Sequence, residues 1–226
     1  MPIVDVDALY PPSYFLGHSY GADPLRDQMY RQERNRIYGY KRKGRILDVG
    51  CGVGAFLDCF DDRWEKWGIE PARFAAEAAQ RRGIQLARPW SITDYSGYWN
   101  VIVFRGTIQH VPHPFEYLEK AQGWLADDGL LVLLATPNTN SPYYKLFGTL
   151  PALDPCRNFL LPSDLMMTNA LKNMGYTVRQ VLYPYLGTPY AWPVRDHLRF
   201  FVGWLTRRQT GFAFWRSMME IYATKT

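Results

Sequence analysis

The stretch Arg45–Gly54 (RILDVGCGVG) decides the fold. Its first half is nearly all apolar, which is typical of a buried strand. Three alternating glycines follow, Gly50, Gly52 and Gly54. Glycine lets the backbone turn tightly and lets a ligand lie against bare main chain. A helix over Ala55–Phe60 is predicted next, and amides at a helix start favour negative groups.

Short apolar runs alternate with helical stretches over the following residues. The predicted strands cover 45–50, 64–70, 84–90, 98–105 and 129–136, with helices over 71–82 and 114–125. Strands without an apolar–polar alternation are expected in a parallel sheet that is covered on both faces. The alternation of strands with helices therefore indicates a doubly wound α/β sheet.

The C-terminal part shows a different pattern. A helix is predicted over 162–174, with Ser163 as its cap and Gly175 as its stop. Strands are predicted over 176–183 and 219–223, and no ordinary crossover helix links them. The sequence therefore predicts an antiparallel pair added to the parallel sheet.

Composition and charge exclude several classes of protein. With 226 residues, 47% hydrophobic and 21% charged, the chain suits one well-cored domain rather than a disordered or collagen-like segment. Its three cysteines (Cys51, Cys59, Cys156) form no C-x-x-C pair, which disfavours a disulfide framework and a thiolate zinc site. We expect a cytoplasmic protein with no signal peptide, and no apolar run is long enough to span a bilayer.

The net charge of +5 is concentrated near the C-terminus. Residues 176–226 hold seven Lys or Arg and two Asp or Glu, together with many aromatic residues. Such a segment suits either a solvated basic face over an aromatic core or contact with an anionic partner or a membrane surface.

Two acids stand beside the glycine loop. Asp48 closes the strand just before it, and Glu70 ends the next predicted strand, 22 residues later. An acid at that second place can accept hydrogen bonds from both hydroxyls of a ribose. Asp48 either contacts a ligand or fixes the loop by accepting its amides.

The pattern D-x-G-x-G-x-G followed by G-I-E resembles the cofactor loop of the class I S-adenosylmethionine-dependent methyltransferases. Residues 104–114 (FRGTIQHVPHP), 129–138 (GLLVLLATPN) and 218–225 (MMEIYATK) are similar to later segments of that superfamily. The nearest branch is the small-molecule type found around glycan and natural-product biosynthesis, similar to methyltransferase domain families 23 and 11. A nicotinamide-dependent oxidoreductase stays an alternative, since Gly50, Gly52 and Ala55 also satisfy the looser G-x-G-x-x-G/A fingerprint.

The resemblance implies an α/β, Rossmann-like, doubly wound seven-stranded sheet, mostly parallel with an antiparallel last strand. We expect a single domain over 1–226, made of an N-terminal helical flap (1–44), a core (45–183), a lid or insertion (184–216) and the last strand (217–226). It also implies the residues that bind S-adenosylmethionine, namely Asp48, Gly50, Cys51, Gly52, Gly54, Glu70, Pro71, Trp90, Ser91, Ile92, Arg105 and Gly106. Trp90 is expected to stack on the adenine or to pack at the edge of the core.

Methyl transfer from a sulfonium needs mainly alignment, and a hydroxyl acceptor also profits from a general base. His110 is the candidate base because it follows the fourth strand, at the edge where open α/β sheets bind ligands. A structural or cofactor-contacting role for His110 remains open. His113 is expected in a turn, and His18 lies in a segment (14–20) that is expected to fold over the cofactor.

Several departures from the superfamily pattern limit the interpretation. Gly106 replaces the usual acid and Gln109 the usual Glu, which keeps a non-catalytic S-adenosylmethionine-binding protein as an alternative. The Asn/Asp-Pro-Pro-Tyr motif of amino-group nucleic-acid methyltransferases is absent, so a DNA partner is not expected and RNA is disfavoured. No ligand-spaced acids follow the fifth strand, so no metal is expected.

The expected partner is a small-molecule substrate, a sugar or an aromatic metabolite, methylated most plausibly at a hydroxyl. Aromatic walls with few charges are predicted around it, from Pro137, Asn138, Tyr143, Tyr144, Tyr185, Tyr190 and Trp192. Residues 195–208 (RDHLRFFVGWLTRR) predict an amphipathic helix that is a lid, a peripheral membrane contact or a dimer contact.

Overall fold

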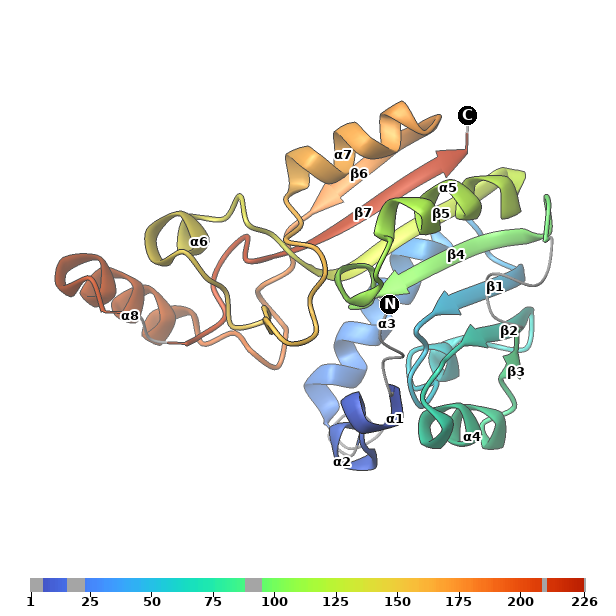
Figure 1. Cartoon of the computed structure of the whole chain (residues 1–226), viewed down its shortest axis with the longest axis horizontal. Coiled ribbons are helices and arrows are strands. Elements are labelled where there is room, and N and C mark those ends of the chain that lie inside the picture. Colours follow the sequence, from blue (N-terminus) through green and yellow to red (C-terminus); the bar gives the residue numbers. More distant parts are fainter. Residues whose placement is uncertain (1–5, 16–22, 88–94, 209–210, 226) are drawn as a thin grey trace.

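One seven-stranded sheet, in the order β3-β2-β1-β4-β5-β7-β6, forms the centre of the computed structural model (Figure 1). The structure describes residues 6–15, 23–87, 95–208 and 211–225. The strands are β1 (Gly44–Val49), β2 (Trp64–Ile69), β3 (Gln85–Leu86), β4 (Trp99–Arg105), β5 (Leu125–Pro137), β6 (Tyr176–Leu182) and β7 (Met218–Lys225). β1 to β5 pair in parallel, while β7 runs antiparallel to both β5 and β6. The predicted fold class, including the antiparallel C-terminal pair, is confirmed.

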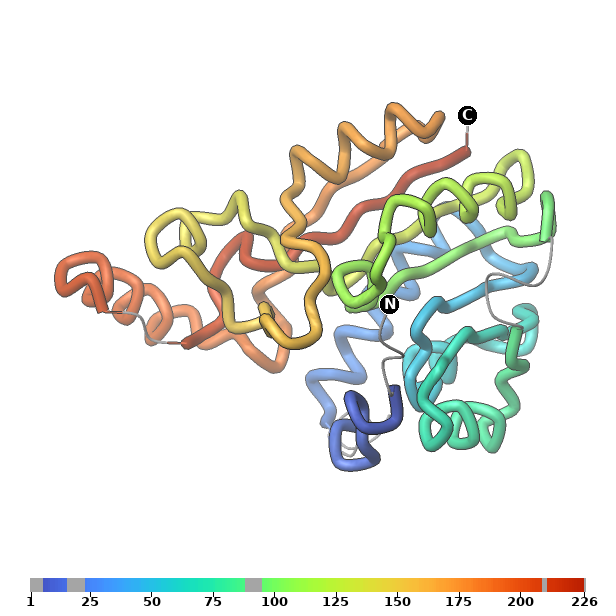
Figure 2. Tube along the Cα trace, in the orientation of Figure 1, coloured from blue at the N-terminus to red at the C-terminus, as the bar shows by residue number. Residues whose placement is uncertain are grey.

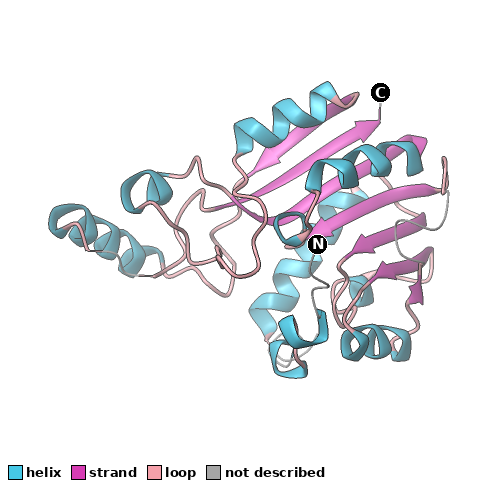
Figure 3. Cartoon of the chain, in the orientation of Figure 1, coloured by secondary structure: helices cyan, strands magenta, loops and turns pink. Residues whose placement is uncertain are grey.

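Helices cover both faces of the sheet, as Figure 3 shows. The α-helices of the described residues, those of the lobe included, are α1 (Val6–Leu9), α2 (Pro12–Phe15), α3 (Pro24–Tyr38), α4 (Arg73–Arg81), α5 (Pro114–Trp124), α6 (Pro142–Phe147), α7 (Asp164–Asn173) and α8 (Pro193–Thr206). α3 and α4 pack on one face through buried residues such as Ile37 and Ala75. α5 and α7 pack on the other face through Leu118 and Leu171. Ser163 caps α7 as predicted, its hydroxyl accepting from the Met166 amide at 3.2 Å.

The helix predicted over 55–60 is wrong. Only a single 3-10 turn, η2 (Leu57–Cys59), follows the glycine loop. Phe56 and Phe60 are both buried and contact each other edge to face, so these residues fill the core instead of extending a helix. The amides of Gly50 and Cys51 donate to the Ile69 carbonyl, and the amide of Gly52 donates to Glu70.

A smaller lobe lies beyond the carboxyl ends of the strands. Tyr143, Leu150, Phe212 and Phe214 form its own apolar cluster, apart from the two clusters that flank the sheet. The lobe carries α6 and α8, and α8 lies at the end of the molecule farthest from the sheet (Figure 2). Phe212, Phe214 and α8 of this lobe fall within the predicted insertion over 184–216, and Tyr143 and Leu150 lie outside it.

Candidate functional site

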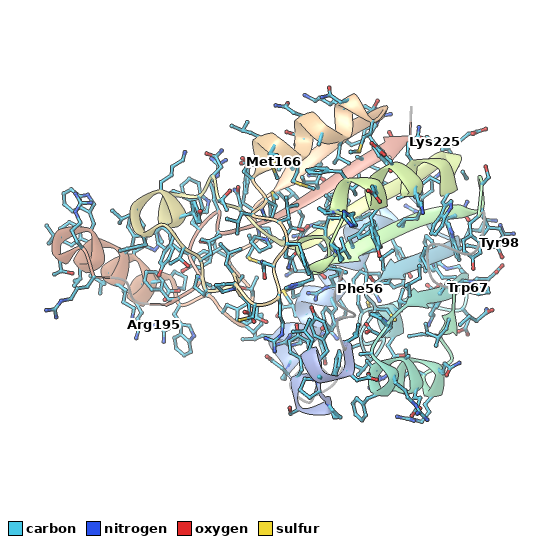
Figure 4. The ribbon with its side chains drawn as sticks, viewed as in Figure 1. Phe56, Trp67, Tyr98, Met166, Arg195 and Lys225 are labelled. Atoms are coloured by element: carbon cyan, nitrogen blue, oxygen red, sulfur yellow. The ribbon has the colours of Figure 1, made fainter. Side chains whose placement is uncertain are left out.

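A cavity of about 1030 Å³ joins the edge of the sheet to the aromatic lobe. It lies at the point where the strand order reverses, since β1 has β2 on one side and β4 on the other. Open α/β sheets bind ligands in this crevice, outside the carboxyl ends of the strands. Figure 4 labels one lining residue from each side, Phe56 beside the sheet and Arg195 on α8.

The glycine loop after β1 forms the floor of the cavity. Gly50 has a φ of +77°, and a Cβ there would lie 2.5 Å from the Thr107 hydroxyl oxygen, so only glycine fits. The nearest group to a Cβ on Gly52 would be the Phe15 ring, at 3.7 Å. Gly50, Cys51 and Gly52, three of the residues predicted to contact the cofactor, line the cavity.

Gly54 has a different role from the one predicted. A Cβ on Gly54 would lie only 2.1 Å from Cδ1 of Ile84. Gly54 is not among the residues that line the cavity. Its missing side chain therefore allows the loop to pack closely on the core. The Cys51 sulfur packs against the backbone of Gly68. Its burial there raises the pKa of the thiol.

Two carboxyl groups, the buried Asp48 and the half-buried Glu70, face the cavity from the ends of β1 and β2. Asp48 is 2% exposed, and its Oδ1 has no hydrogen-bond partner among the described residues. Burial raises the pKa of Asp48 to about 7, against the opposing effect of Arg105. Glu70 accepts the Gly52 amide on Oε2 and the Ala72 amide on Oε1, both at 2.8 Å. Burial likewise raises the pKa of Glu70.

Arg105, at the end of β4, lines the cavity, but its guanidinium contacts other side chains of the protein. Its Nε donates to Glu33 of α3 at 2.8 Å, and its guanidinium lies 4.4 Å from the Tyr30 ring centre. The side chains of Arg105 and Glu33 are 14% and 2% exposed. Arg105 thus ties α3 to the sheet beside the cavity. Gly106 and Pro71, the remaining described residues of the predicted set, also line it.

His110 closes η3 (Ile108–His110), directly after β4, and lines the cavity. Its Nδ1 lies 3.0 Å from the carbonyl oxygen of Arg157, which can only accept, so Nδ1 carries the proton. Its Nε2 then accepts from the side-chain amide of Gln109 at 3.1 Å. Burial lowers the pKa of His110, so the imidazole is neutral near neutral pH. The geometry therefore provides a neutral imidazole of fixed tautomer at the cavity wall.

The N-terminal flap covers the glycine loop. Tyr10, in the turn between α1 and α2, and Tyr14 and Phe15, on α2, line the cavity, and Phe15 is buried. The Arg157 guanidinium lies over the rings of Tyr10 and Tyr14, at 5.7 and 5.4 Å, and its Nε donates to the Leu9 carbonyl at 3.2 Å. Arg157 therefore couples the flap to the loop that holds His110. Sequence reasoning missed this residue because it lies in a loop without a motif.

The aromatic lobe forms the other end of the cavity. Tyr185, Tyr190 and Trp192 line it, as predicted. Besides Arg105, three more arginines line the cavity, Arg26, Arg195 and Arg199, so the expectation of few charges is wrong.

Pro137, Asn138, Tyr143 and Tyr144 were expected to line the acceptor side, but they are not among the cavity residues. Tyr143 is fully buried in the lobe's own core. Asn138 is fully buried as well, and its side chain contacts Asp164.

Four residues of the sequence analysis lie outside the described residues: His18, Trp90, Ser91 and Ile92. Across the described ranges, no three His, Cys, Asp or Glu side chains gather as a metal site would require. No helix within those ranges is both long and apolar enough to cross a membrane.

Comparisons with known proteins agree with this architecture. A family model described as a methyltransferase domain matches residues 25–181, so the chain belongs to that family. A trans-aconitate 2-methyltransferase of Mycobacterium sp. is 29% identical over 49% of this chain and 45% of the relative. A ubiquinone biosynthesis O-methyltransferase of Actinobacillus pleuropneumoniae is 27% identical over 54% of this chain and 56% of the relative. The chain spans about half the length of these curated relatives.

A solved structure shows the same fold. The S-adenosylmethionine-dependent methyltransferase of Archaeoglobus fulgidus has a TM-score of 0.59 at 17% identity, covering 88% of this chain and 94% of that one. The family model confirms that the chain belongs to a methyltransferase family, and the likeness to this structure confirms the fold. S-adenosylmethionine stays the predicted cofactor.

The cavity residues fit this cofactor. The buried Asp48 Oδ1 is an acceptor that still lacks a donor among the described residues. Burying an unpaired acceptor is costly, so a ligand that donates a hydrogen bond there is favoured. Gly52 presents bare main chain to the same space, and each Glu70 oxygen accepts one amide and retains capacity for another donor.

Proposed function

We propose that this protein transfers a methyl group from S-adenosylmethionine to an oxygen atom of a small molecule, a sugar hydroxyl or a related biosynthetic intermediate. One observation carries the proposal. A single cavity connects the glycine loop, the buried Asp48 and the half-buried Glu70 to a compartment lined by aromatic rings and arginines. Such a cavity accommodates a cofactor at one end and an acceptor at the other.

The cofactor end is assigned to residues of β1, β2 and the loop between them. Glu70 would accept from the ribose hydroxyls, and Asp48 would accept from a donor of the same ligand. The main chain of Gly50, Cys51 and Gly52 would lie against it. When bound, the cofactor supplies a methyl group that is already activated on a sulfonium. The protein then has to align the acceptor and to exclude water. The flap over the glycine loop would exclude the water.

His110 is the proposed general base for a hydroxyl acceptor. Its Nδ1–H donates to the Arg157 carbonyl, which fixes the tautomer and leaves the lone pair on Nε2. Because burial lowers its pKa, the imidazole is free to take a proton at neutral pH. An acceptor hydroxyl has to displace the Gln109 amide from Nε2 to reach it.

The acceptor end favours a ring that carries a negative group. Tyr190 and Trp192 offer flat faces for a sugar or an aromatic ring, and Arg195 and Arg199 offer cationic donors. The relative from Actinobacillus is named an O-methyltransferase, which supports oxygen as the methylated atom. The cytoplasmic location stays a prediction.

Binding and turnover are tested separately. Calorimetry should show binding of S-adenosylhomocysteine and not of NAD, and binding of NAD alone would refute the proposal. Turnover is then measured as S-adenosylhomocysteine release with sugars, sugar phosphates and phenolic acids, and mass spectrometry locates the added methyl group. Methylation at nitrogen or carbon would overturn the assignment of oxygen while leaving the methyltransferase assignment intact.

A further inference from the structure

The inner face of α8 is fixed to the lobe. Phe200 stacks on Phe214 with ring centres 4.4 Å apart and planes nearly parallel. Gly203 lets the helix approach Phe147, since a Cβ there would lie 2.6 Å from the Phe147 ring. Asp196 is fully buried and accepts from the Tyr185 hydroxyl and the Trp192 amide, both at 2.8 Å. The helix therefore has one defined orientation, and its opposite face is turned outward.

That opposite face is apolar and exposed. Five large apolar side chains recur at helical spacing and are each between 55% and 78% exposed: Val194, Leu198, Phe201, Val202 and Leu205. Residues at these positions lie on one side of a helix. Trp192 and Trp204 flank the stripe and are 59% and 50% exposed. Single exposed apolar residues are ordinary, but a continuous stripe of this size indicates a binding surface.

Positive charge surrounds the stripe. Arg195 and Arg199 lie on α8, and Arg207 and Arg208 follow it directly. Asp196 is the sole acid of the helix and is buried, where it pairs with Arg195 at 3.3 Å, so it offsets that one charge and leaves those of Arg199, Arg207 and Arg208. An apolar face bordered by arginines and tryptophans is the pattern of a helix that lies in the interface of an anionic membrane.

A second copy of the chain fits the same face less well. A two-fold contact places identical patches against each other, and the arginines around both stripes would then repel. The position of α8 at the far end of the long axis leaves its outer face clear of the sheet and its helices (Figure 1). A flat surface can therefore reach the stripe without meeting the body of the protein.

We propose that the outer face of α8 binds the surface of an anionic lipid bilayer, with the helix lying in the interfacial plane. The apolar stripe enters the boundary of the acyl chains, and the arginines contact the head groups. Trp192, Arg195 and Arg199 also line the cavity. Membrane binding would thus place the acceptor end of the cavity at the bilayer surface.

The test is co-sedimentation with vesicles of equimolar phosphatidylcholine and phosphatidylglycerol, and with vesicles of phosphatidylcholine alone. The wild-type protein should bind the anionic vesicles more strongly, and added salt should weaken this binding. Phe201→Asp and Leu205→Asp should each lower the partition coefficient by about ten-fold or more, because a buried apolar side chain is replaced by an anion. Arg207→Glu combined with Arg208→Glu should reduce the preference for anionic vesicles.

Leu165→Asp is the matched control. Leu165 is 63% exposed on α7, so the change has the same chemistry at a site away from α8 and should leave vesicle binding unchanged. Thermal melting of every variant checks folding without relying on any ligand, so failure of the proposed enzymatic function does not affect this test. Absence of vesicle binding overturns the proposal. So does a solution dimer, seen by sedimentation equilibrium, that Phe201→Asp converts to monomer without any change in vesicle binding.

Discussion

Replacing Glu70 by alanine tests the cofactor end of the cavity most directly. Its two carboxylate oxygens accept the Gly52 and Ala72 amides at 2.8 Å, one amide each. Each oxygen retains a second lone pair, which suits one ribose hydroxyl. Hydrogen bonds to a charged group contribute about 1.5–3 kcal/mol each, with part of that lost to competing water. We expect Glu70→Ala to weaken S-adenosylhomocysteine binding by about 1.5–3 kcal/mol, roughly 10- to 150-fold in Kd.

Part of this loss has a second possible origin, because Glu70 also holds the glycine loop through Gly52. A ligand that lacks both ribose hydroxyls separates the two effects. If Glu70 binds the ribose, this deoxy ligand should bind the wild-type protein weakly and lose little more in Glu70→Ala. Titration calorimetry with both ligands and both proteins gives the coupling.

Glu77→Ala is the control for this experiment. Glu77 lies on α4, where its exposed side chain pairs with Arg73, away from the cavity residues. Its removal should leave the affinity for both ligands unchanged. An unchanged affinity for S-adenosylhomocysteine in Glu70→Ala would refute ribose binding by Glu70. An equal loss for both ligands would show that Glu70 acts only through the loop.

Three further predictions concern buried charges and His110. Glu33→Ala should lower the free energy of unfolding by about 3–5 kcal/mol in urea titrations, because the buried Arg105 loses its partner; a loss below about 1 kcal/mol would contradict this. The pKa of Asp48 is raised to about 7, so the folded protein holds this proton more tightly than the unfolded chain, and its contribution to stability falls as pH rises from about 4 to about 7. Asp48→Asn should remove that part of the pH dependence, and unchanged curves would place the titration elsewhere. His110→Ala should lower kcat by about 10²- to 10⁴-fold while S-adenosylhomocysteine affinity stays within a few-fold, and equal losses of both would show that His110 is only a ligand contact.

The sheet was predictable because its signals are local. Asp48 lies within the apolar run that ends before Gly50, and most of the paired strands, such as β1 and β2, are consecutive in the chain. The helix predicted after the loop failed because the same residues, Phe56 and Phe60 among them, satisfy both a helical pattern and a compact aromatic turn. The local sequence does not distinguish the helix from the turn, because tertiary packing determines which of the two forms.

Most residues predicted for the glycine-loop side line the cavity, while on the lobe side the prediction holds for some aromatic residues and fails for others. Asp48 and Glu70 stand at strand ends, where the fold itself determines their direction. Arg157 reaches His110 and the flap from a loop, across contacts between residues far apart in sequence. An aromatic residue such as Tyr143 suits the wall of a ligand site and the core of a lobe equally well in sequence. In the structure Tyr143 is buried in the core of the lobe. Contacts of this kind depend on how distant segments pack together, and the spacing of residues along the chain does not predict that packing.

The lobe joins the acceptor chemistry to the membrane proposal through one helix. On α8, the side that carries Arg195 and Arg199 lines the cavity, while the stripe around Leu198 and Phe201 faces outward. A helix that served only as a lid would gain stability from polar residues on its outer face, because water contacts them there. The exposed apolar stripe is therefore unexplained by the lid role alone. Binding of α8 to an anionic lipid bilayer explains the stripe, because a bilayer has an apolar interior below its charged head groups. Such binding would hold the acceptor end of the cavity at the bilayer surface.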